Sequence, residues 1–454
     1  MPNLDPYLEA QRQRFEEQLC QFLRIPSVST DPAHKEDMQR AAQWVADWAC
    51  RLGFSAEILP TPGHPVVYAE SPRVAGAPTA LVYGHYDVQP AEPSDKWQSP
   101  PFEPTRRNDC IYARGASDNK GQLLTHLFSA EAWTQVMGRL PINLKFLVEG
   151  EEEVGSPSLE PLIRQQSERL ACDCIVISDG VQFGPNQPAI TYGLRGIAYY
   201  HLVLRGPCRD LHSGSFGGSV TNPANTLARM LAALCDQRGK VQIPGFYDEV
   251  VPPSARERSQ LAALPFDEEQ YLAKVGVSGA VGEEGFTVLE RRWTRPSFDV
   301  NGLWSGYQGE GAKTILPESA GAKFSFRLVP EQDPEKIGRS LRAMLEAMCP
   351  PGIRMELSDL HGSAAVMVPL DSPYVQAAAR ALEYAFGRAP VFTREGGSIP
   401  IVAVLHHTLR ADTLLLGWGQ DDDNSHSPNE KFALADFHRG IRASARLWEE
   451  LSRM

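Results

Sequence analysis

Hydrophobic positions in the N-terminal part of the chain switch between a helical and a strand-like spacing. Apolar side chains recur every three to four residues over residues 7–24 and 36–52, which predicts two amphipathic helices. The second of these patterns ends at Leu52-Gly53, a typical helix stop.

Short apolar runs follow, and they are typical of buried strands. One helical stretch, Gly121–Trp133, separates the second run from the third. The runs are Val66–Ala69, Thr79–Tyr83, Ile142–Val148 and Cys174–Ser178. Strands that alternate with helices predict an α/β domain with a mainly parallel sheet flanked by helices. In such sheets functional groups gather beyond the carboxyl ends of the strands.

The pattern changes near residue 193. Polar and apolar side chains alternate over Ile197–Leu204 and again over Lys323–Val329, and a helical run follows each, at Asn225–Gln237 and Pro334–Met348. This order of strand, helix, strand and helix predicts a compact α+β domain inserted into the α/β domain.

The C-terminal part returns to the first pattern. Apolar strands are predicted at Ile401–Leu405 and Thr413–Leu416, and a last helix at Ala435–Leu451. The stretch 244–304 is rich in Pro, Gly and Glu, and we predict no structure for it. The expected domains are residues 1–194 with 393–454 for the α/β domain, and 195–392 for the insert.

Composition narrows the functional classes. The 454 residues carry a net charge of −12 and contain no Lys/Arg-rich run, which argues against a nucleic-acid partner. No apolar run is long enough to span a membrane, and the polar, acidic N-terminus lacks a signal-peptide core. The eight scattered cysteines, of which only Cys172 and Cys174 are close in sequence, indicate free thiols in a reducing cytoplasm.

Five segments place a histidine or a carboxylate where one predicted element gives way to the next. Each has an ordinary explanation on its own: His-x-Asp is common, an Asp before a helix caps it, clustered acids are solvated, an Asp after a strand forms a turn, and a loop His lies at the surface. The segments are LVYGHYDVQP with His85 and Asp87, YARGASDNKG with Asp118, INLKFLVEGEEEVGS, CIVISDG with Asp179, and WGQDDDNSHSPNEKF with His426.

Five such junctions in one predicted sheet favour a metal centre over five separate surface features. Two histidines with several carboxylates form a ligand set that suits zinc, manganese or cobalt. With only two histidines and at least three acids, two ions that share a carboxylate are more natural than one. Hydrolytic sites of this kind hold their two ions about 3.5–4 Å apart.

Nine motifs, in order, resemble those of the di-metal aminopeptidase-like hydrolase family and cover about residues 80–431. They are GHYDVQP, RGASDNKG, EGEEEVGS, SDG, DLHSGSFGG, GAKTILP, FSFRLVP, REGGSIPI and DDDNSHSPNEK. The family contains carnosinases, cytosolic non-specific dipeptidases, glutamate carboxypeptidases, carboxypeptidase G and aminoacylases, and the likeness is greatest to the dipeptidase/carnosinase branch. The resemblance implies a metallopeptidase that hydrolyses dipeptides or similar small peptides.

The resemblance also implies a ligand set for two divalent ions, zinc or manganese. One ion would be held by His85, Asp118 and Asp179, and the other by Asp118, Glu153 and His426. Asp118 would therefore bridge the two ions.

Catalytic roles follow from the same resemblance. Asp87 would hydrogen-bond His85 and fix its ring, and Glu152 would be the general base that takes a proton from a water between the ions and passes it to the leaving amine. The peptide bond between Asp118 and the next residue is expected to be cis. Glu151 stands where relatives vary, so we expect it to face solvent.

For the insert, the resemblance implies a lid and dimerisation domain, and hence a homodimer. His212 would reach into the partner's site and stabilise the carbonyl oxyanion, with Thr314 as a further substrate contact. Arg327 would grip the terminal carboxylate of the substrate, and His361 and Ser398 match further substrate contacts. Without the resemblance, His212 fits a turn and Arg327 fits an ion pair on a strand face.

Two other functions and one other type of metal site predict different sequence features. An N-acyl-amino-acid amidohydrolase or desuccinylase would share the metal ligands and differ in the pocket that reads the amino end. A non-catalytic homologue would lack a ligand or the base, yet all five ligand positions and Glu152 are present. A single-metal zincin requires H-E-x-x-H, which does not occur in the sequence.

Overall fold

The chain is described by a computed structural model that covers residues 3–397 and 399–454. Its internal contacts divide it into two compact units, one formed by residues 1–192, 368–393 and 404–454 and the other by residues 193–367 and 394–403. Among the described residues, no helix is both long enough and apolar enough to cross a membrane. The domain boundaries expected from the sequence stay a prediction.

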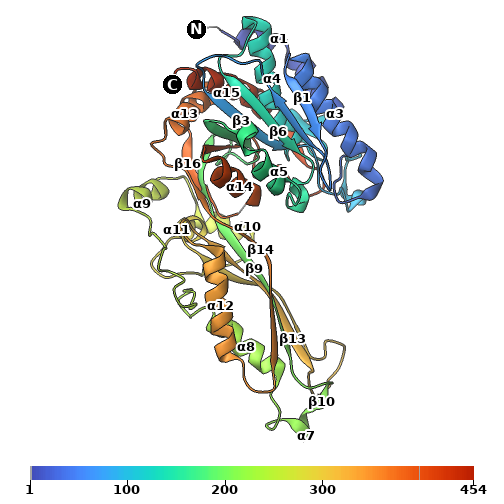
Figure 1. The fold of residues 1–454 in the computed structure, drawn as a ribbon, viewed down its shortest axis with the longest axis vertical. Coiled ribbons are helices and arrows are strands. Elements are labelled where there is room, and N and C mark those ends of the chain that lie inside the picture. Colours follow the sequence, from blue (N-terminus) through green and yellow to red (C-terminus); the bar gives the residue numbers. More distant parts are fainter. Residues whose placement is uncertain (1–2, 398) are drawn as a thin grey trace. The chain divides into compact units, whose positions relative to one another are not determined.

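The first unit is built on a large twisted sheet whose centre is parallel (Figure 1). The central strands β6, β3, β7 and β17 are parallel neighbours, and antiparallel strands β1 and β2 extend one side. The bounds are β1 (Ser55–Leu59), β2 (Val66–Glu70), β3 (Thr79–His85), β6 (Asn143–Glu149), β7 (Cys174–Ser178) and β17 (Asp412–Leu416). The predicted α/β class is confirmed.

The other side of the sheet continues into short antiparallel strands. β8 (Ala189–Leu194) pairs with β17 through its first residues, and its last two residues pair with β15 (Val366–Met367). β16 (Val391–Glu395) also pairs with β8. A separate three-stranded sheet, in the order β18-β5-β4, is formed by β4 (Thr105–Arg107), β5 (Cys110–Tyr112) and β18 (Lys431–Ala433).

Helices cover the large sheet because their apolar stripes need a surface on which to bury. α3 packs on β1 and β2, α4 on β3, and α13 on β17, while α15 lies between α4 and α13. α4 is buried over most of its circumference and ends at Gly138, whose φ of 71° suits glycine. The helices are α1 (Asp5–Ala10), α2 (Arg12–Leu23), α3 (Lys35–Arg51), α4 (Lys120–Met137), α5 (Leu159–Gln165), α6 (Ser167–Leu170), α13 (Pro373–Phe386) and α15 (Leu434–Leu451).

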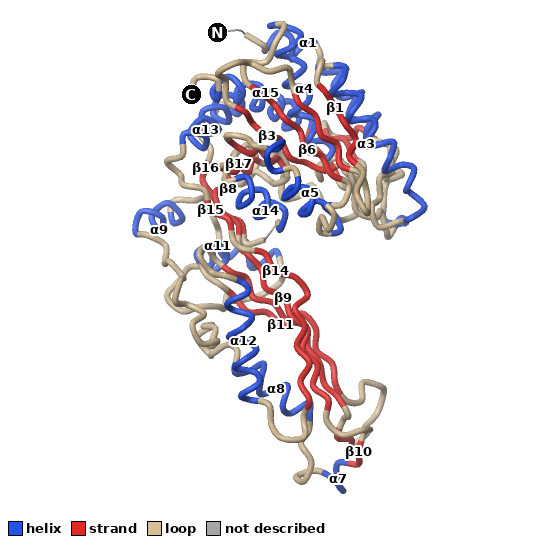
Figure 2. The backbone as a smooth tube through the Cα atoms, in the orientation of Figure 1, coloured by secondary structure: helices blue, strands red, loops and turns tan. Residues whose placement is uncertain are grey.

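The second unit contains a four-stranded antiparallel sheet with two helices packed on it (Figure 2). The strand order is β11-β13-β9-β14, and α8 and α12 bury their apolar faces against the sheet in a core of its own. The bounds are β9 (Gly196–Arg205), β11 (Ser297–Ser305), β13 (Ser319–Leu328), β14 (Arg354–Ser363), α8 (Pro223–Ala233) and α12 (Pro334–Met348).

The Pro-, Gly- and Glu-rich stretch 244–304, for which the sequence predicted no structure, consists of short helices joined by loops. It holds three short helices and the start of β11; the helices are α9 (Ala255–Ala262), α10 (Glu268–Lys274) and α11 (Val288–Thr294). Buried ion pairs hold this stretch, with Arg295 donating two hydrogen bonds to Glu283 at 2.7 Å each and Arg394 paired with Glu257. The small pieces α7 (Ser213–Phe216), β10 (Leu211–His212) and β12 (Ile315–Leu316) complete the unit.

Two element predictions are wrong. Residues 401–405 form no strand but belong to helix α14 (Pro400–Leu409), which continues through three polar residues to Leu409. A continuous apolar run has no period that separates a buried strand from a buried helix. The single helix predicted over 7–24 is two helices, α1 and α2, with Gln11 between them at φ −98° and ψ 0°.

Candidate metal centre

The parallel centre of the large sheet brings acids and a histidine to one edge. β3 ends at His85, β6 ends at Glu149 and β7 ends at Ser178, so His85, the acidic turn after β6 and Asp179 all follow carboxyl ends at this edge. His85 lies opposite Glu149 in the register of β3 and β6. Parallel strands gather their carboxyl ends on one side, which explains why segments far apart in sequence meet here.

Asp118 reaches the same edge by a different route. It lies in the loop between β5 and α4, and β5 belongs to the small sheet, so the prediction that all five segments follow strands of one sheet is wrong for Asp118. The peptide bond between Asp118 and Asn119 is cis, as expected. The Asn119 side chain donates to the carbonyl of Ser178 at 2.6 Å and to Asp179 Oδ1 at 2.9 Å, which joins the loop to the end of β7.

Asp118, the residue expected to bridge two ions, faces two histidines with its two carboxylate oxygens. Oδ1 lies 3.2 Å from His85 Nε2, and Oδ2 lies 2.9 Å from His426 Nε2. Asp179 Oδ2 is 3.7 Å from the same His85 nitrogen, and Glu153 Oε2 is 3.2 Å from the same His426 nitrogen. The structure therefore brings together His85, Asp118 and Asp179 as one cluster, and Asp118, Glu153 and His426 as another.

The residues in these clusters fit cations. His85 is fully buried, and its Nε2 faces the carboxylates of Asp118 and Asp179 at 3.2 and 3.7 Å. Burial lowers the pKa of His85, yet hydrogen bonds with Asp118, Asp179 and Asp87 outweigh burial and raise that pKa well above its usual value. Excess negative charge therefore draws protons onto this site, and divalent ions would supply the same positive charge.

Asp87 holds both the histidine and the acidic turn. Its fully buried carboxylate accepts the backbone N–H groups of Glu152 at 3.3 Å and Glu153 at 3.1 Å. The Nδ1 atom of His85 lies 3.0 Å from the carbonyl oxygen of Asp87 and 3.3 Å from its Oδ1. Gln89, which the sequence reasoning did not single out, donates to Glu153 Oε2 at 2.8 Å. The sequence feature that could have pointed to Gln89 is its position inside the GHYDVQP motif.

Glu152 is half-buried beside the two clusters. Burial, followed by the charges of Asp179, Glu153 and Asp118, raises its pKa to about 8, although the charge of His85 lowers it. Cations in the two clusters would offset the neighbouring negative charges and lower this pKa, so that the carboxylate could accept and release protons near neutral pH as a general base does.

Glu151 does not face solvent, so that expectation is wrong. Its side chain is buried and accepts the backbone N–H of His64 at 3.1 Å and that of Ser158 at 3.2 Å. Gly63 allows this approach, because a Cβ there would lie 1.6 Å from Glu151 Oε1. Glu151 thus binds neighbouring backbone while the next two acids turn toward the histidines.

A buried glutamate below the turn fixes its register. Glu149 accepts the hydroxyl of Tyr83 at 2.6 Å and that of Ser156 at 2.7 Å. The turn closes with Gly155 at φ 87° and Ser156 at φ 54°, both in the left-handed region. These contacts determine which glutamate faces which partner.

The expected substrate contacts of the insert lie in the second unit. His212 is exposed on β10, where its Nδ1 accepts the N–H of Gly214 at 3.1 Å, and the carbonyl of Thr314 accepts the N–H of Ser213 at 3.1 Å. His212 and Thr314 therefore lie on neighbouring segments. Ser398 lies outside the described residues.

Arg327 and His361 lie on the main sheet of the same unit. Arg327 is on β13, and His361 on β14 packs edge-on against Tyr199, with ring centroids 5.3 Å apart. Burial and the charge of Arg327 lower the pKa of His361, so the two side chains share one electrostatic environment.

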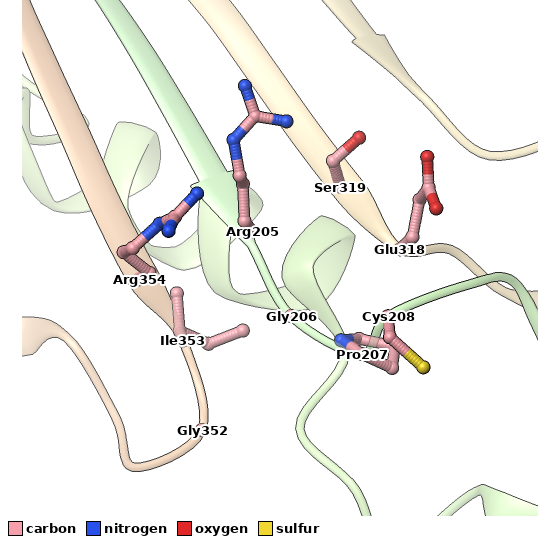
Figure 3. A pocket seen from close by; sticks show the side chains of 9 residues that line it. All are labelled: Arg205, Gly206, Pro207, Cys208, Glu318, Ser319, Gly352, Ile353 and Arg354. Atoms are coloured by element: carbon pink, nitrogen blue, oxygen red, sulfur yellow. The ribbon is translucent and has the colours of Figure 1, made fainter.

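A hollow in this unit, where β9 ends and β13 and β14 begin, is not a comparable site (Figure 3). Its two arginines, Arg205 and Arg354, both lie 3.0 Å from Glu356 Oε1. Their charges are thus compensated by a shared carboxylate.

Fold and site together define a metal-dependent hydrolase of the α/β class, with two groups of candidate metal ligands that share one aspartate at the edge of a parallel sheet. The chain belongs to peptidase family M20/M25/M40, whose family model matches residues 81–450.

The similarity to known proteins extends over nearly the whole chain. It is 33% identical to the Cys-Gly metallodipeptidase DUG1 of Candida albicans, over 96% of this chain and 94% of that protein. It is 31% identical to the human Beta-Ala-His dipeptidase, over 99% and 92%. The solved structure of the M20 family metallo-carboxypeptidase Sso-CP2 from Sulfolobus solfataricus is 34% identical, with a TM-score of 0.86 and coverage of 97% and 99%.

Proposed function

We propose that this protein is a dipeptidase that hydrolyses the amide bond of dipeptides with two divalent metal ions. The observation that carries the proposal is the position of Asp118, whose two oxygens face His85 and His426 at 3.2 and 2.9 Å. The dipeptidases to which the chain is similar over nearly its full length support this substrate class.

Two ions, zinc or manganese, would occupy the two clusters. His85, Asp118 and Asp179 would hold one ion, and Asp118, Glu153 and His426 the other. When bound, the ions would polarise the substrate carbonyl and make water more acidic. The mixed nitrogen and oxygen donors suit zinc, manganese and cobalt alike.

The proton transfers would be carried out by Glu152. Its carboxylate takes a proton from the water whose oxygen forms the new bond to the carbonyl carbon. As the carbon–nitrogen bond breaks, the same proton passes to the leaving amine nitrogen. Asp87 holds the backbone of Glu152 by accepting its N–H at 3.3 Å, and the Glu152 carboxylate belongs to neither group of ligands.

Residues outside the metal clusters would bind the substrate. Arg327 would bind the terminal carboxylate in a two-pronged contact, and His361 and Ser398 would be further substrate contacts. His212, with Thr314, would stabilise the oxyanion from the partner subunit of a homodimer, which its exposure on β10 supports. The eight free cysteines support a cytoplasmic location.

A substrate panel tests this function. We expect hydrolysis of dipeptides with a free carboxylate, and loss of hydrolysis after dialysis against a chelator, restored by zinc or manganese. Preference for N-acyl amino acids would support an amidohydrolase instead. Removal of single C-terminal residues from longer peptides would support a carboxypeptidase, the activity named for a 34% identical structure.

Cation binding should weaken as the pH falls. In the ion-free chain, hydrogen bonds with Asp118 and Glu153 raise the pKa of His426 to about 10. His426 is therefore protonated below pH 10 and must lose that proton to bind an ion. Because of this one proton, the affinity for the ion should fall by about tenfold for each unit by which the pH is lowered. Calorimetric titration with Mn²⁺ between pH 6.5 and 8.5 measures this slope, and an affinity independent of pH would contradict it.

A further inference from the structure

Glu430 is a fully buried carboxylate four residues after His426, and the sequence reasoning did not single it out. Its Oε1 accepts the backbone N–H groups of Ser117 at 2.9 Å and Asp118 at 3.0 Å. Its Oε2 accepts the backbone N–H of Gly115 at 2.8 Å and Nη1 of Arg114 at 2.9 Å. One side chain therefore satisfies three backbone donors of the loop that carries Asp118.

Arg114 extends this contact to the segment that follows His85. It is almost fully buried, and its Nη2 donates to the carbonyl of Pro90 at 3.1 Å. The Arg114–Glu430 pair thus touches three of the segments that bear candidate ligands: the one after His85, the one before Asp118 and the one after His426.

The surrounding contacts join the same two loops. The N–H of Ala113 donates to the carbonyl of Glu430 at 3.1 Å, directly before the pairing of β18 with β5. The hydroxyl of Ser117 donates to Asp423 Oδ2 at 2.9 Å. Asp118 and His426 are far apart in sequence. These hydrogen bonds therefore fix the position of the loop that carries Asp118 against the loop that carries His426.

We propose that the Arg114–Glu430 pair positions the shared ligand Asp118 against His426 and so determines the affinity and geometry of both cation sites. The inference rests on the proposed two-ion function. Neither residue would touch ion or substrate; both act through the loops they hold. Groups that orient metal ligands in this way typically affect affinity by about 10–100-fold.

The test is a titration of the metal-free full chain with Co²⁺ alone, followed by its visible absorption. Glu430→Gln keeps the size but places an amide against backbone donors. Arg114→Lys keeps the charge but loses the fork that reaches both Glu430 and Pro90. We expect both variants to bind Co²⁺ about 10–100-fold more weakly, with an altered absorption spectrum.

Glu450→Gln is the matched control. Glu450 is a buried carboxylate of the same unit that pairs with Arg380 at 2.7 Å, Arg446 at 2.6 Å and Arg453 at 2.8 Å. It lies on α15 and accepts no bond from either loop that bears a ligand in the part of the chain the structure describes. We expect this variant to lower thermal stability and to leave Co²⁺ affinity and spectrum unchanged.

Folded Glu430→Gln and Arg114→Lys variants that keep the wild-type affinity and spectrum would overturn the inference. If Glu430→Gln does not fold, Arg114→Lys decides alone. A wild-type chain that binds no Co²⁺ would also overturn it. A wild-type chain that binds Co²⁺ but hydrolyses no dipeptide would remove the proposed function, while weaker Co²⁺ binding by the variants would still support the positioning role.

Discussion

Replacing Glu152 by Gln should reduce kcat by about 10²–10⁴-fold, the usual contribution of a general base. The amide keeps the size of the side chain but cannot accept a proton. Glu152 belongs to neither ligand cluster, so the variant should retain two ions per chain and a KM near that of the wild type. Steady-state kinetics on a dipeptide, with metal content measured on the same sample, tests this result.

Glu151→Gln is the control for that experiment. It makes the same chemical change one residue earlier, at a side chain that binds the backbone of His64 and Ser158. We expect kcat to stay within a few-fold of the wild type. A Glu152→Gln enzyme that turns over at the wild-type rate, or a Glu151→Gln enzyme that loses turnover instead, would show that the register of the acidic turn has been misassigned.

Replacing Asp118 by Asn should weaken the binding of both metal ions at once. The amide keeps one oxygen, so it cannot face His85 and His426 with two anionic oxygens as the carboxylate does at 3.2 and 2.9 Å. We expect the affinity at each site to fall by more than the roughly 10–100-fold typical of groups that merely orient ligands. Activity at micromolar metal should be lost, and titration with Mn²⁺ measures both affinities.

Glu153→Gln is the control for Asp118→Asn, because it changes a ligand that belongs to one cluster only. Glu153 belongs only to the cluster with His426, so its loss should remove one ion and leave the other with its affinity. An Asp118→Asn chain that keeps one ion at wild-type affinity would behave like this control, and Asp118 would then not be shared.

The positions of the site residues on the large sheet could be predicted because they follow from topology. Apolar runs that end at His85, before the acidic turn and at Ser178 are buried strands, and parallel strands present their carboxyl ends together. The placement of Asp118 could not be predicted in this way. It depends on β5 pairing with β18, and a pairing of three-residue strands far apart in sequence leaves no periodic signal.

The burial of Glu151 and Glu430 could not be predicted from the sequence. Solvent exposure is expected for Glu151 because it stands where relatives vary, yet the backbone N–H groups of His64 and Ser158 bind it and it is buried. The role of Glu430 in its acidic loop could not be predicted for the same reason, because the sequence pattern does not show which backbone donors a carboxylate will meet. The start of helix α14 resembles a strand in sequence because the apolar run Ile401–Leu405 has no polar positions to reveal a period.

The central claim is a centre of two ions that share Asp118, and its most direct test is a titration of turnover against metal content. Metal-free protein should gain full dipeptide hydrolysis only as the bound zinc or manganese reaches two ions per chain. Full turnover at one ion per chain, with no further gain on binding a second, would contradict the account.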